Sequence, residues 1–388
     1  MMPDTIDPVE EGIRRAQAEA FQAVPAGGGK VVPMRGGSLA NVPTGPVCVG
    51  LRAFLAETDP PVWLIGGILQ SNYLYALTAP TNHGKTAVSL VMAVCVAAGL
   101  PFAERPVLQG NVLILCGENQ DGFRLRLMAT MESLGVSLAD IGERIWVLPQ
   151  SVGLAFVLEQ VKTDAAGMGE LAMVLVDTSV SFFSGDNEND NQQAYGHARD
   201  LRELTMLPGK PAVLVNCHPS ASAGKDMSRD SCVPRGGSAF LNEIDTNLTV
   251  WAEGENAEFH WMRKKRGPDF SPIQFEYKAI YVEQHGQKVP TVVAEPISEE
   301  RERAMRNKRK EDEDRMLFAL KTNPNGTFAE WAHECGWTVQ QGRHEGAPLK
   351  VKVGRVLERL KSGQFVARDA RNGWHLTAKG KKEAEGIH

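Results

Sequence analysis

Residues 73–86 read YLYALTAPTNHGKT, and this stretch is the strongest single indication of the fold. Its first part, 73–78, is apolar and aromatic, which is typical of a buried strand. A polar loop follows at 79–86, and the apolar run 87–100 after it is typical of a buried helix. That run is too short to span a bilayer. The order strand, loop, helix predicts a helix whose amino end faces a bound anion.

The loop matches the phosphate-binding pattern in which a glycine-containing turn leads into Lys-Thr. Its residues are Ala79, Pro80, Thr81, Asn82, His83, Gly84, Lys85 and Thr86, with Ala79 in place of the usual first glycine. Gly84 lets the backbone N–H groups approach the β-phosphate of ATP without a Cβ. Lys85 places a positive charge between the β- and γ-phosphates, and the Thr86 hydroxyl ligates Mg²⁺. We therefore expect ATP and Mg²⁺ as cofactors; the alternative is a chance match in an ordinary strand–turn–helix connection.

Two carboxylates come at the ends of further apolar strands. Residues 173–177 form an apolar strand ending in Asp177, which we expect at the carboxyl edge of the sheet. There it can hold the water shell of Mg²⁺ beside Thr86, although an aspartate in this place can also cap a turn. Glu118 follows the apolar run 112–116, where a carboxylate can deprotonate the attacking water. The alternative is a surface glutamate in a strand–helix loop.

The composition along the chain predicts an N-terminal arm and two domains joined by a charged segment. Residues 1–45 are rich in Gly, Pro and Ala and predict a flexible arm. Residues 46–298 alternate strand and helix patterns, which predicts an α/β domain with a mainly parallel sheet and, within 246–285, antiparallel edge strands. Residues 299–312 are almost entirely charged and predict a linker or a solvated helix. Residues 313–388 carry their own apolar periodicity and predict a second, small domain.

The overall composition excludes several classes of protein. The chain has 388 residues, of which 43% are hydrophobic and 23% charged, as in soluble globular proteins. Its net charge of -5 gives no global signature of nucleic-acid binding. Six scattered cysteines without a CxxC pair predict reduced thiols, not disulfides or a zinc site. The N-terminus lacks the apolar run of a signal peptide, so we expect a cytoplasmic protein without a membrane anchor.

The C-terminal segment predicts a winged helix, because three helical patterns precede a small two-stranded hairpin. Residues 349–382 contain ten Lys and Arg against two Asp and Glu. Such local positive charge is typical of nucleic-acid binding, and Lys352 and Arg355 are candidate contacts to duplex DNA. The alternative is a winged helix that contacts protein, with these residues present for solubility.

The order of these motifs resembles RecA-type hexameric helicases, most of all the RepA-like and DnaB-like replicative ATPases of plasmids and phages. The resemblance covers about residues 60–285. It implies that Glu118 is the catalytic base and that His218, after the strand pattern 213–217, senses the γ-phosphate. Cys217 stands where this family often has the first of two histidines, and a histidine after a strand can also be structural. The resemblance further implies a homo-oligomer, most simply a hexameric ring.

The same resemblance implies contacts to DNA and to a neighbouring subunit. Residues 220–234 resemble the central-channel loop that grips single-stranded DNA, and Arg235 begins a match to the Arg-Gly-Ser-Ser-Ala element of the family. The basic hairpin at 263–268 resembles the hairpin that reaches the next subunit's nucleotide, with Arg266 as the arginine finger beside Lys264. A solvated turn and a DNA-phosphate contact are the alternatives for this hairpin. The acidic segment 184–191 also resembles a family loop, without an assignable chemistry.

The function expected from these patterns is ATP hydrolysis coupled to DNA. The chain resembles a replicative helicase or replication-initiation ATPase of a phage, plasmid or other mobile element. Two alternatives stay open, because they share the phosphate loop and the site between subunits. One is a non-translocating ATP switch that regulates or loads other proteins on DNA. The other is a recombination ATPase that forms filaments on DNA.

Overall fold

The computed structural model describes residues 48–56, 60–220, 231–254, 256–284, 286–341, 344–369 and 373–387. The chain divides into two units, 1–60 and 61–388. The described part of the first unit contains the short helix α2 (Leu51–Ala56). The expected arm at 1–45 and residues 221–230 of the expected channel loop lie outside the described residues.

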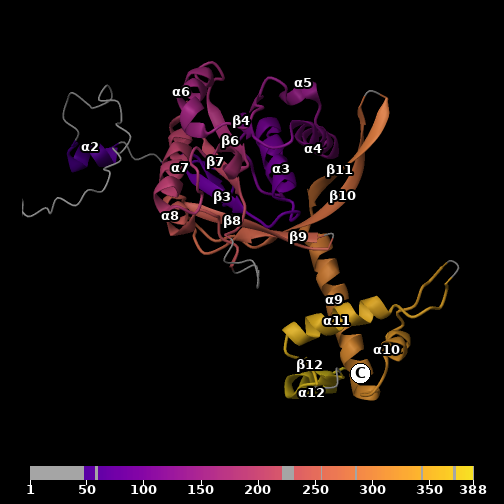
Figure 1. The fold of residues 1–388 in the computed structure, drawn as a ribbon. Helices are drawn as coiled ribbons and strands as arrows, with labels where there is room; N and C mark the ends of the chain where they lie inside the picture. Colours follow the sequence, from indigo (N-terminus) through magenta and orange to yellow (C-terminus); the bar gives the residue numbers. More distant parts are fainter. Residues whose placement is uncertain are drawn as a thin grey trace, which may run out of the picture. The chain divides into compact units, whose positions relative to one another are not determined.

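A nine-stranded sheet with the order β11-β10-β9-β8-β3-β7-β6-β4-β5 is the centre of the second unit (Figure 1). The parallel strands are β3 (Leu74–Thr78), β4 (Asn111–Cys116), β5 (Ile145–Leu148), β6 (Leu171–Asp177), β7 (Ala212–Cys217) and β8 (Thr246–Glu253). An antiparallel extension follows, made by β9 (Asn256–Trp261), β10 (Ile273–Gln284) and β11 (Gln287–Pro296). The predicted mixed α/β class with a mainly parallel sheet is confirmed.

Two details of the sheet differ from the sequence patterns. We expected β8 among the antiparallel strands, but it is parallel to β3 and antiparallel only to β9. The reason is that the chain crosses one face of the sheet through a helix between β7 and β8, and such a crossover joins parallel strands. The strand β11 was not predicted, because its sequence QKVPTVVAEP contains two prolines and lacks a clear alternation of apolar and polar residues.

Helices cover both faces of this sheet (Figure 1). One face carries α3 (Lys85–Ala98), α4 (Gln120–Ser133) and α5 (Leu138–Ile141), and the other carries α6 (Leu154–Ala165), α7 (Asn191–Glu203) and α8 (Gly237–Glu243). Successive strand residues point to opposite faces, so in β6 Met173 and Leu175 join one core while Val174 and Val176 join the other. Strands buried on both faces need nearly continuous apolar sequence, which is why the strand runs were recognisable.

The C-terminal elements enclose an apolar cluster of their own. They are α9 (Glu299–Thr322), α10 (Phe328–Glu334), α11 (Lys350–Ser362), β12 (Val366–Arg368), β13 (Trp374–Leu376) and α12 (Ala378–Glu385). Trp331, Trp337 and Trp374 are buried in this cluster. The charged segment 299–312 is helical and forms the first half of α9. The winged-helix assignment stays a prediction, and α12 was not predicted.

Smaller elements complete the described chain. They are the hairpin of β1 (Trp63–Ile65) with β2 (Leu69–Gln70) and the 3-10 turns η2 (Ser179–Phe182) and η3 (Leu204–Met206). Within the described ranges, no helix combines the length and the apolar character that crossing a membrane requires.

Candidate functional site

The sheet order brings the residues predicted to bind and hydrolyse ATP within one chain to the carboxyl ends of the parallel strands. β3, β7, β6 and β4 are neighbours, so their carboxyl ends lie side by side. β4 and β6 end in register, with Cys116 opposite Asp177. The carboxyl ends of these four strands therefore meet. Asp177 is the last residue of β6, and the phosphate loop 79–86, His218 and Glu118 follow the other three strands.

The phosphate loop has the backbone shape that its sequence requires. α3 begins at Lys85, directly after Gly84, whose φ of 81° lies in the left-handed region that favours glycine. Ala79 is fully buried, and its N–H donates to the carbonyl of Cys217 at 3.3 Å. The backbone φ angle of Ala79 is not positive, so this position does not require glycine. Lys85 is buried behind the loop, and burial lowers the pKa of its ammonium group.

Thr86 and Asp177 meet at the amino end of α3. The Thr86 hydroxyl donates to Oδ1 of Asp177 at 3.3 Å, and the Asn216 amide donates to the same oxygen at 2.8 Å. Oδ2 of Asp177 is buried and has no hydrogen-bond partner within the described residues. Burial raises the pKa of this carboxyl group, because the hydrogen bonds from Asn216 and Thr86 and the charge of Lys85 offset the desolvation of its charged form only in part.

These two side chains fit a divalent cation. A hydroxyl and one carboxylate are the oxygen ligands that Mg²⁺ takes from a protein when phosphate oxygens and water complete its shell. The orphaned Oδ2 of Asp177 is the atom that a cation with its water shell would compensate. No group of three or more His, Cys, Asp or Glu suited to a metal ion occurs within the described residues. A site of the Mg²⁺–nucleotide kind does not need one.

Glu118 lies beside this pair and is exposed to solvent. The Thr178 hydroxyl donates to its Oε1 at 3.2 Å. Lys85 lies in the field of both Glu118 and Asp177. The sequence patterns did not identify Thr178, although a hydroxyl residue directly after Asp177 was a usable signal. Thr178 meets Glu118 because β6 and β4, the strands that precede them, are neighbours. The arrangement can hold a carboxylate at a fixed position facing water.

His218 and Arg235 are joined through the backbone. The Arg235 N–H donates to the His218 carbonyl at 2.9 Å, and His218 is half-buried. Burial lowers the pKa of the His218 imidazole, and the charge of Lys85 lowers it further. The Arg235 guanidinium is paired with Glu188, which gives the acidic segment 184–191 a structural role that its sequence did not reveal.

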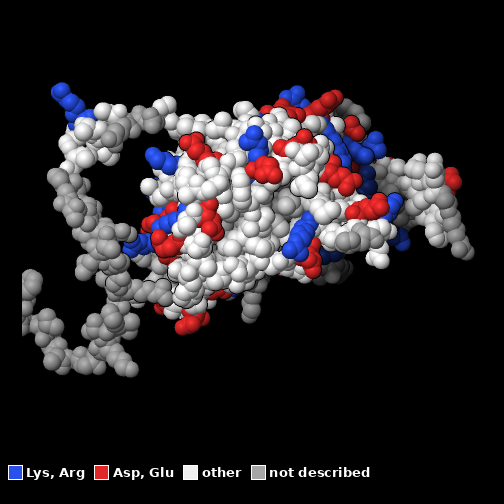
Figure 2. All heavy atoms as spheres, turned by 90° about the horizontal axis from the view of Figure 1, so that it is seen from above, with Lys and Arg blue, Asp and Glu red and all other residues white. Residues whose placement is uncertain are grey.

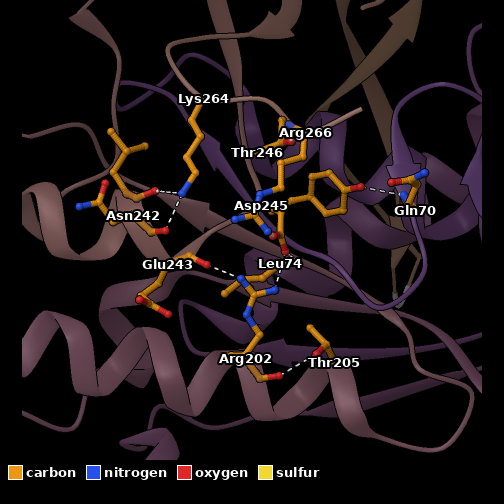
Figure 3. A network of polar contacts seen from close by, with 12 residues as sticks. Gln70, Leu74, Arg202, Thr205, Asn242, Glu243, Asp245, Thr246, Lys264 and Arg266 are labelled. Atoms are coloured by element: carbon orange, nitrogen blue, oxygen red, sulfur yellow. Dashed lines mark hydrogen bonds and ion pairs between the residues drawn. The ribbon is translucent and has the colours of Figure 1, made fainter. Parts of the chain in front are cut away.

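The basic hairpin lies near the amino ends of β3 and β8, where Figure 3 shows Arg266 and Lys264 around Asp245 and Leu74. Arg266 forms an ion pair with the buried carboxylate of Asp245 at 2.7 Å, and Arg202 binds the same carboxylate. Asp245 also accepts the N–H of Leu74, the first residue of β3, whereas the phosphate loop follows the last. Lys264 donates to two carbonyls at the end of α8, at 2.8 and 2.6 Å. Arg266 therefore lies away from the phosphate loop of its own chain.

The candidate DNA contacts of α11 differ in their surroundings. Lys352 pairs with Asp312 of α9 at 2.8 Å and lies over the Trp337 ring at 4.5 Å, whereas Arg355 is exposed. Acidic residues of α9 lie outside the basic window 349–382, so counting charge within that window missed this pairing. Figure 2 likewise shows Lys and Arg mixed with Asp and Glu on the face that it presents.

The fold and the site together have the arrangement of a P-loop NTPase core of the α/β class. Residues 44–223 match the family model of an AAA domain. Such a domain is a P-loop ATPase of the type found in RecA-like helicases. The match supports a nucleotide-hydrolysing ATPase, and such domains typically bind their nucleotide with Mg²⁺. It covers the phosphate loop, Glu118, Asp177 and His218 and ends before α8. No curated protein matches the chain.

Proposed function

We propose that the protein is an oligomeric, DNA-associated ATPase, a replicative helicase or replication-initiation ATPase of a phage, plasmid or other mobile element. The observation that carries the ATPase part is the meeting of the phosphate loop, the Thr86–Asp177 pair and Glu118 at one sheet edge. The DNA and oligomer parts rest on the resemblance of the hairpin 263–268 and of the loop 220–234.

The residues divide the hydrolytic task by their chemistry. Lys85 and the N–H groups at the start of α3 bind the phosphates. Thr86 and Asp177 hold Mg²⁺, which supplies positive charge at the phosphate oxygens when it is bound. Glu118 is exposed to water and held by Thr178, so it can accept the proton of the attacking water molecule. We assign the sensing of the γ-phosphate to His218, which is half-buried and follows the neighbouring strand β7.

The position of Arg266 supports the proposed oligomer. The Arg266 side chain is 61% exposed and lies at the amino ends of the parallel strands, whereas its own phosphate loop lies at their carboxyl ends. This position supports a contact between Arg266 and the nucleotide of a neighbouring subunit. An arginine supplied in that way neutralises charge in the transition state and can contribute roughly 10³–10⁵ in rate. A ring of subunits would also place the loops at 220–234 around single-stranded DNA.

A second candidate function is a non-translocating ATP switch that regulates or loads other proteins. The pairing within the C-terminal elements favours it. Lys352 binds Asp312, and Arg359 binds Glu313 at 3.1 Å, so two cations of α11 are neutralised by α9. Fewer positive charges then remain for DNA phosphates, which favours a protein partner for this region.

The test compares hydrolysis with strand separation in the full-length protein. ATP turnover with Mg²⁺ is measured alone, with single-stranded DNA and with duplex DNA, and strand displacement is measured on a forked duplex. A helicase hydrolyses ATP faster with single-stranded DNA and separates the strands. A switch hydrolyses ATP without displacing strands. A wild-type rate no higher than that of Lys85→Ala contradicts both candidates.

A further inference from the structure

We infer that Tyr277 is a positioning residue for nucleotide binding: its hydroxyl fixes the backbone of the phosphate loop so that the loop presents its N–H groups to the phosphates. This inference rests on the proposed ATPase function. Tyr277 lies on β10, and its hydroxyl donates to the carbonyl oxygen of His83 at 2.6 Å. The two residues are 194 positions apart in sequence, so only the fold brings them together.

The direction of this hydrogen bond determines the direction of the next N–H group. In a planar trans peptide, the carbonyl of one residue and the N–H of the following residue point to opposite sides. Holding the His83 carbonyl towards Tyr277 therefore turns the N–H of Gly84 away from Tyr277. That N–H belongs to the set that surrounds the β-phosphate in a loop of this pattern. The hydroxyl thus orients a phosphate donor without touching the nucleotide.

The position of the Tyr277 ring is also compatible only with a residue that lacks a side chain at position 84. A Cβ built on Gly84 would lie 2.0 Å from the Tyr277 hydroxyl oxygen and 2.3 Å from the ring carbon that bears it. The space that a side chain at position 84 would occupy is therefore filled by Tyr277. Burial raises the pKa of this phenol, so the group keeps its proton and stays a donor at neutral pH.

A second strand holds the same loop residue from another side. The Ala252 N–H donates to Nδ1 of His83 at 3.1 Å, and the Trp251 ring meets the His83 imidazole edge-on with centroids 4.9 Å apart. An acceptor at Nδ1 requires a neutral imidazole. Burial and the charge of Lys85 both lower the pKa of His83, which agrees with that form. Both the carbonyl and the ring of His83 are therefore anchored, by β10 and β8.

The test removes one hydroxyl and keeps the ring. Tyr277→Phe is compared with Tyr281→Phe, which removes a hydroxyl from the same strand at a residue that is 63% exposed. We expect Tyr277→Phe to raise the Kd and KM for ATP about five- to tenfold, as for the loss of one neutral hydrogen bond. We expect kcat to change less than about twofold, because Glu118, Thr86 and Asp177 keep their places. Tyr281→Phe should match the wild type in each measurement.

Hydrogen exchange of the loop amides tests the positioning itself, without nucleotide. The amides of residues 82–86 should exchange faster in Tyr277→Phe than in the wild type and in Tyr281→Phe. Unchanged exchange, or tighter nucleotide binding by Tyr277→Phe, overturns the inference. If instead the wild type binds ATP no better than Lys85→Ala, the proposed ATPase function fails. Even then, the hydrogen-exchange rates of the amides of residues 82–86, measured without nucleotide, decide whether Tyr277 holds the loop.

Discussion

At the scale of single residues, substitutions of Glu118 and Lys85 are expected to impair ATP hydrolysis at different steps. Glu118→Gln keeps the shape of the exposed side chain but cannot accept a proton, so ATP should bind while kcat falls about 10²–10⁴-fold. Lys85→Ala removes the buried cation behind the loop and should abolish binding. Binding of a fluorescent nucleotide and steady-state turnover distinguish the two. Wild-type turnover in Glu118→Gln would remove this residue from the role of base.

His197 provides a residue-scale prediction about acid stability. It packs against Phe183 and Phe240, and Ser179 lies 3.0 Å from its Nε2. Burial lowers the pKa of His197 from 6.5 to about 4. Between these values the unfolded state binds the proton more strongly, so the folded state loses up to about 1.4 kcal/mol per pH unit as the pH falls.

The variant His197→Gln lacks this titration. The difference in unfolding free energy between the wild type and the variant should therefore narrow as the pH falls from 6.5 to 4. Urea unfolding over this pH range measures it. Curves that stay parallel would show that the histidine is protonated in the folded state as readily as in the unfolded state.

At the scale of elements, the sequence predicts strands and loops, which depend on neighbouring residues. It does not predict contacts between residues that are far apart in the chain. The strands and the phosphate loop are visible because a strand buried on both faces is a continuous apolar run. The contact of Tyr277 with His83 joins residues of two distant elements, and no spacing rule connects them. The pairing of α11 with Asp312 is hidden for the same reason, because charge was counted along one segment and not across two helices.

The Asp245 network predicts a difference between two variants of one ion pair (Figure 3). Asp245 is 2% exposed and accepts charge-assisted bonds from Arg202 and Arg266 as well as the N–H of Leu74. Asp245→Ala should therefore lower the unfolding free energy by at least about 2 kcal/mol. Arg266→Ala should cost less than about 1 kcal/mol, because the Arg266 side chain is 61% exposed and Arg202 still compensates Asp245. Chemical denaturation checks both values, and equal costs would contradict this account.

At the scale of the whole molecule, charge is mixed, and DNA affinity has to come from local exposed cations. Arg355 is exposed on α11, whereas Lys352 is tied to Asp312. If α11 binds duplex DNA, Arg355→Glu should weaken binding of the full-length protein severely at low salt, and the affinity should fall steeply as salt is added. Basal ATP turnover should not change. Fluorescence anisotropy over a salt series measures the affinity, and equal binding by the variant assigns this region to protein contacts.

The assembly prediction concerns Arg266. This side chain lies near the start of β3 and the phosphate loop of the same chain follows the end of β3, so Arg266 cannot contact a nucleotide bound to its own chain. If it acts on a neighbour, Arg266→Ala subunits should be inactive alone yet keep an intact phosphate loop. Lys85→Ala subunits should be inactive alone yet keep an intact Arg266. A mixed interface can then combine the Lys85 of one subunit with the Arg266 of the next, and part of the ATP turnover should return on mixing.

The control for this experiment is co-assembly, shown by mixing subunits that carry different tags and purifying one tag. The double variant Lys85→Ala with Arg266→Ala, mixed with either single variant, adds no complete site and should restore nothing. Recovery that depends on the mixing ratio and appears only with the complementary pair places Arg266 at the neighbouring nucleotide. Without recovery in demonstrated mixed assemblies, the bond between Arg266 and Asp245 is a structural contact within one chain.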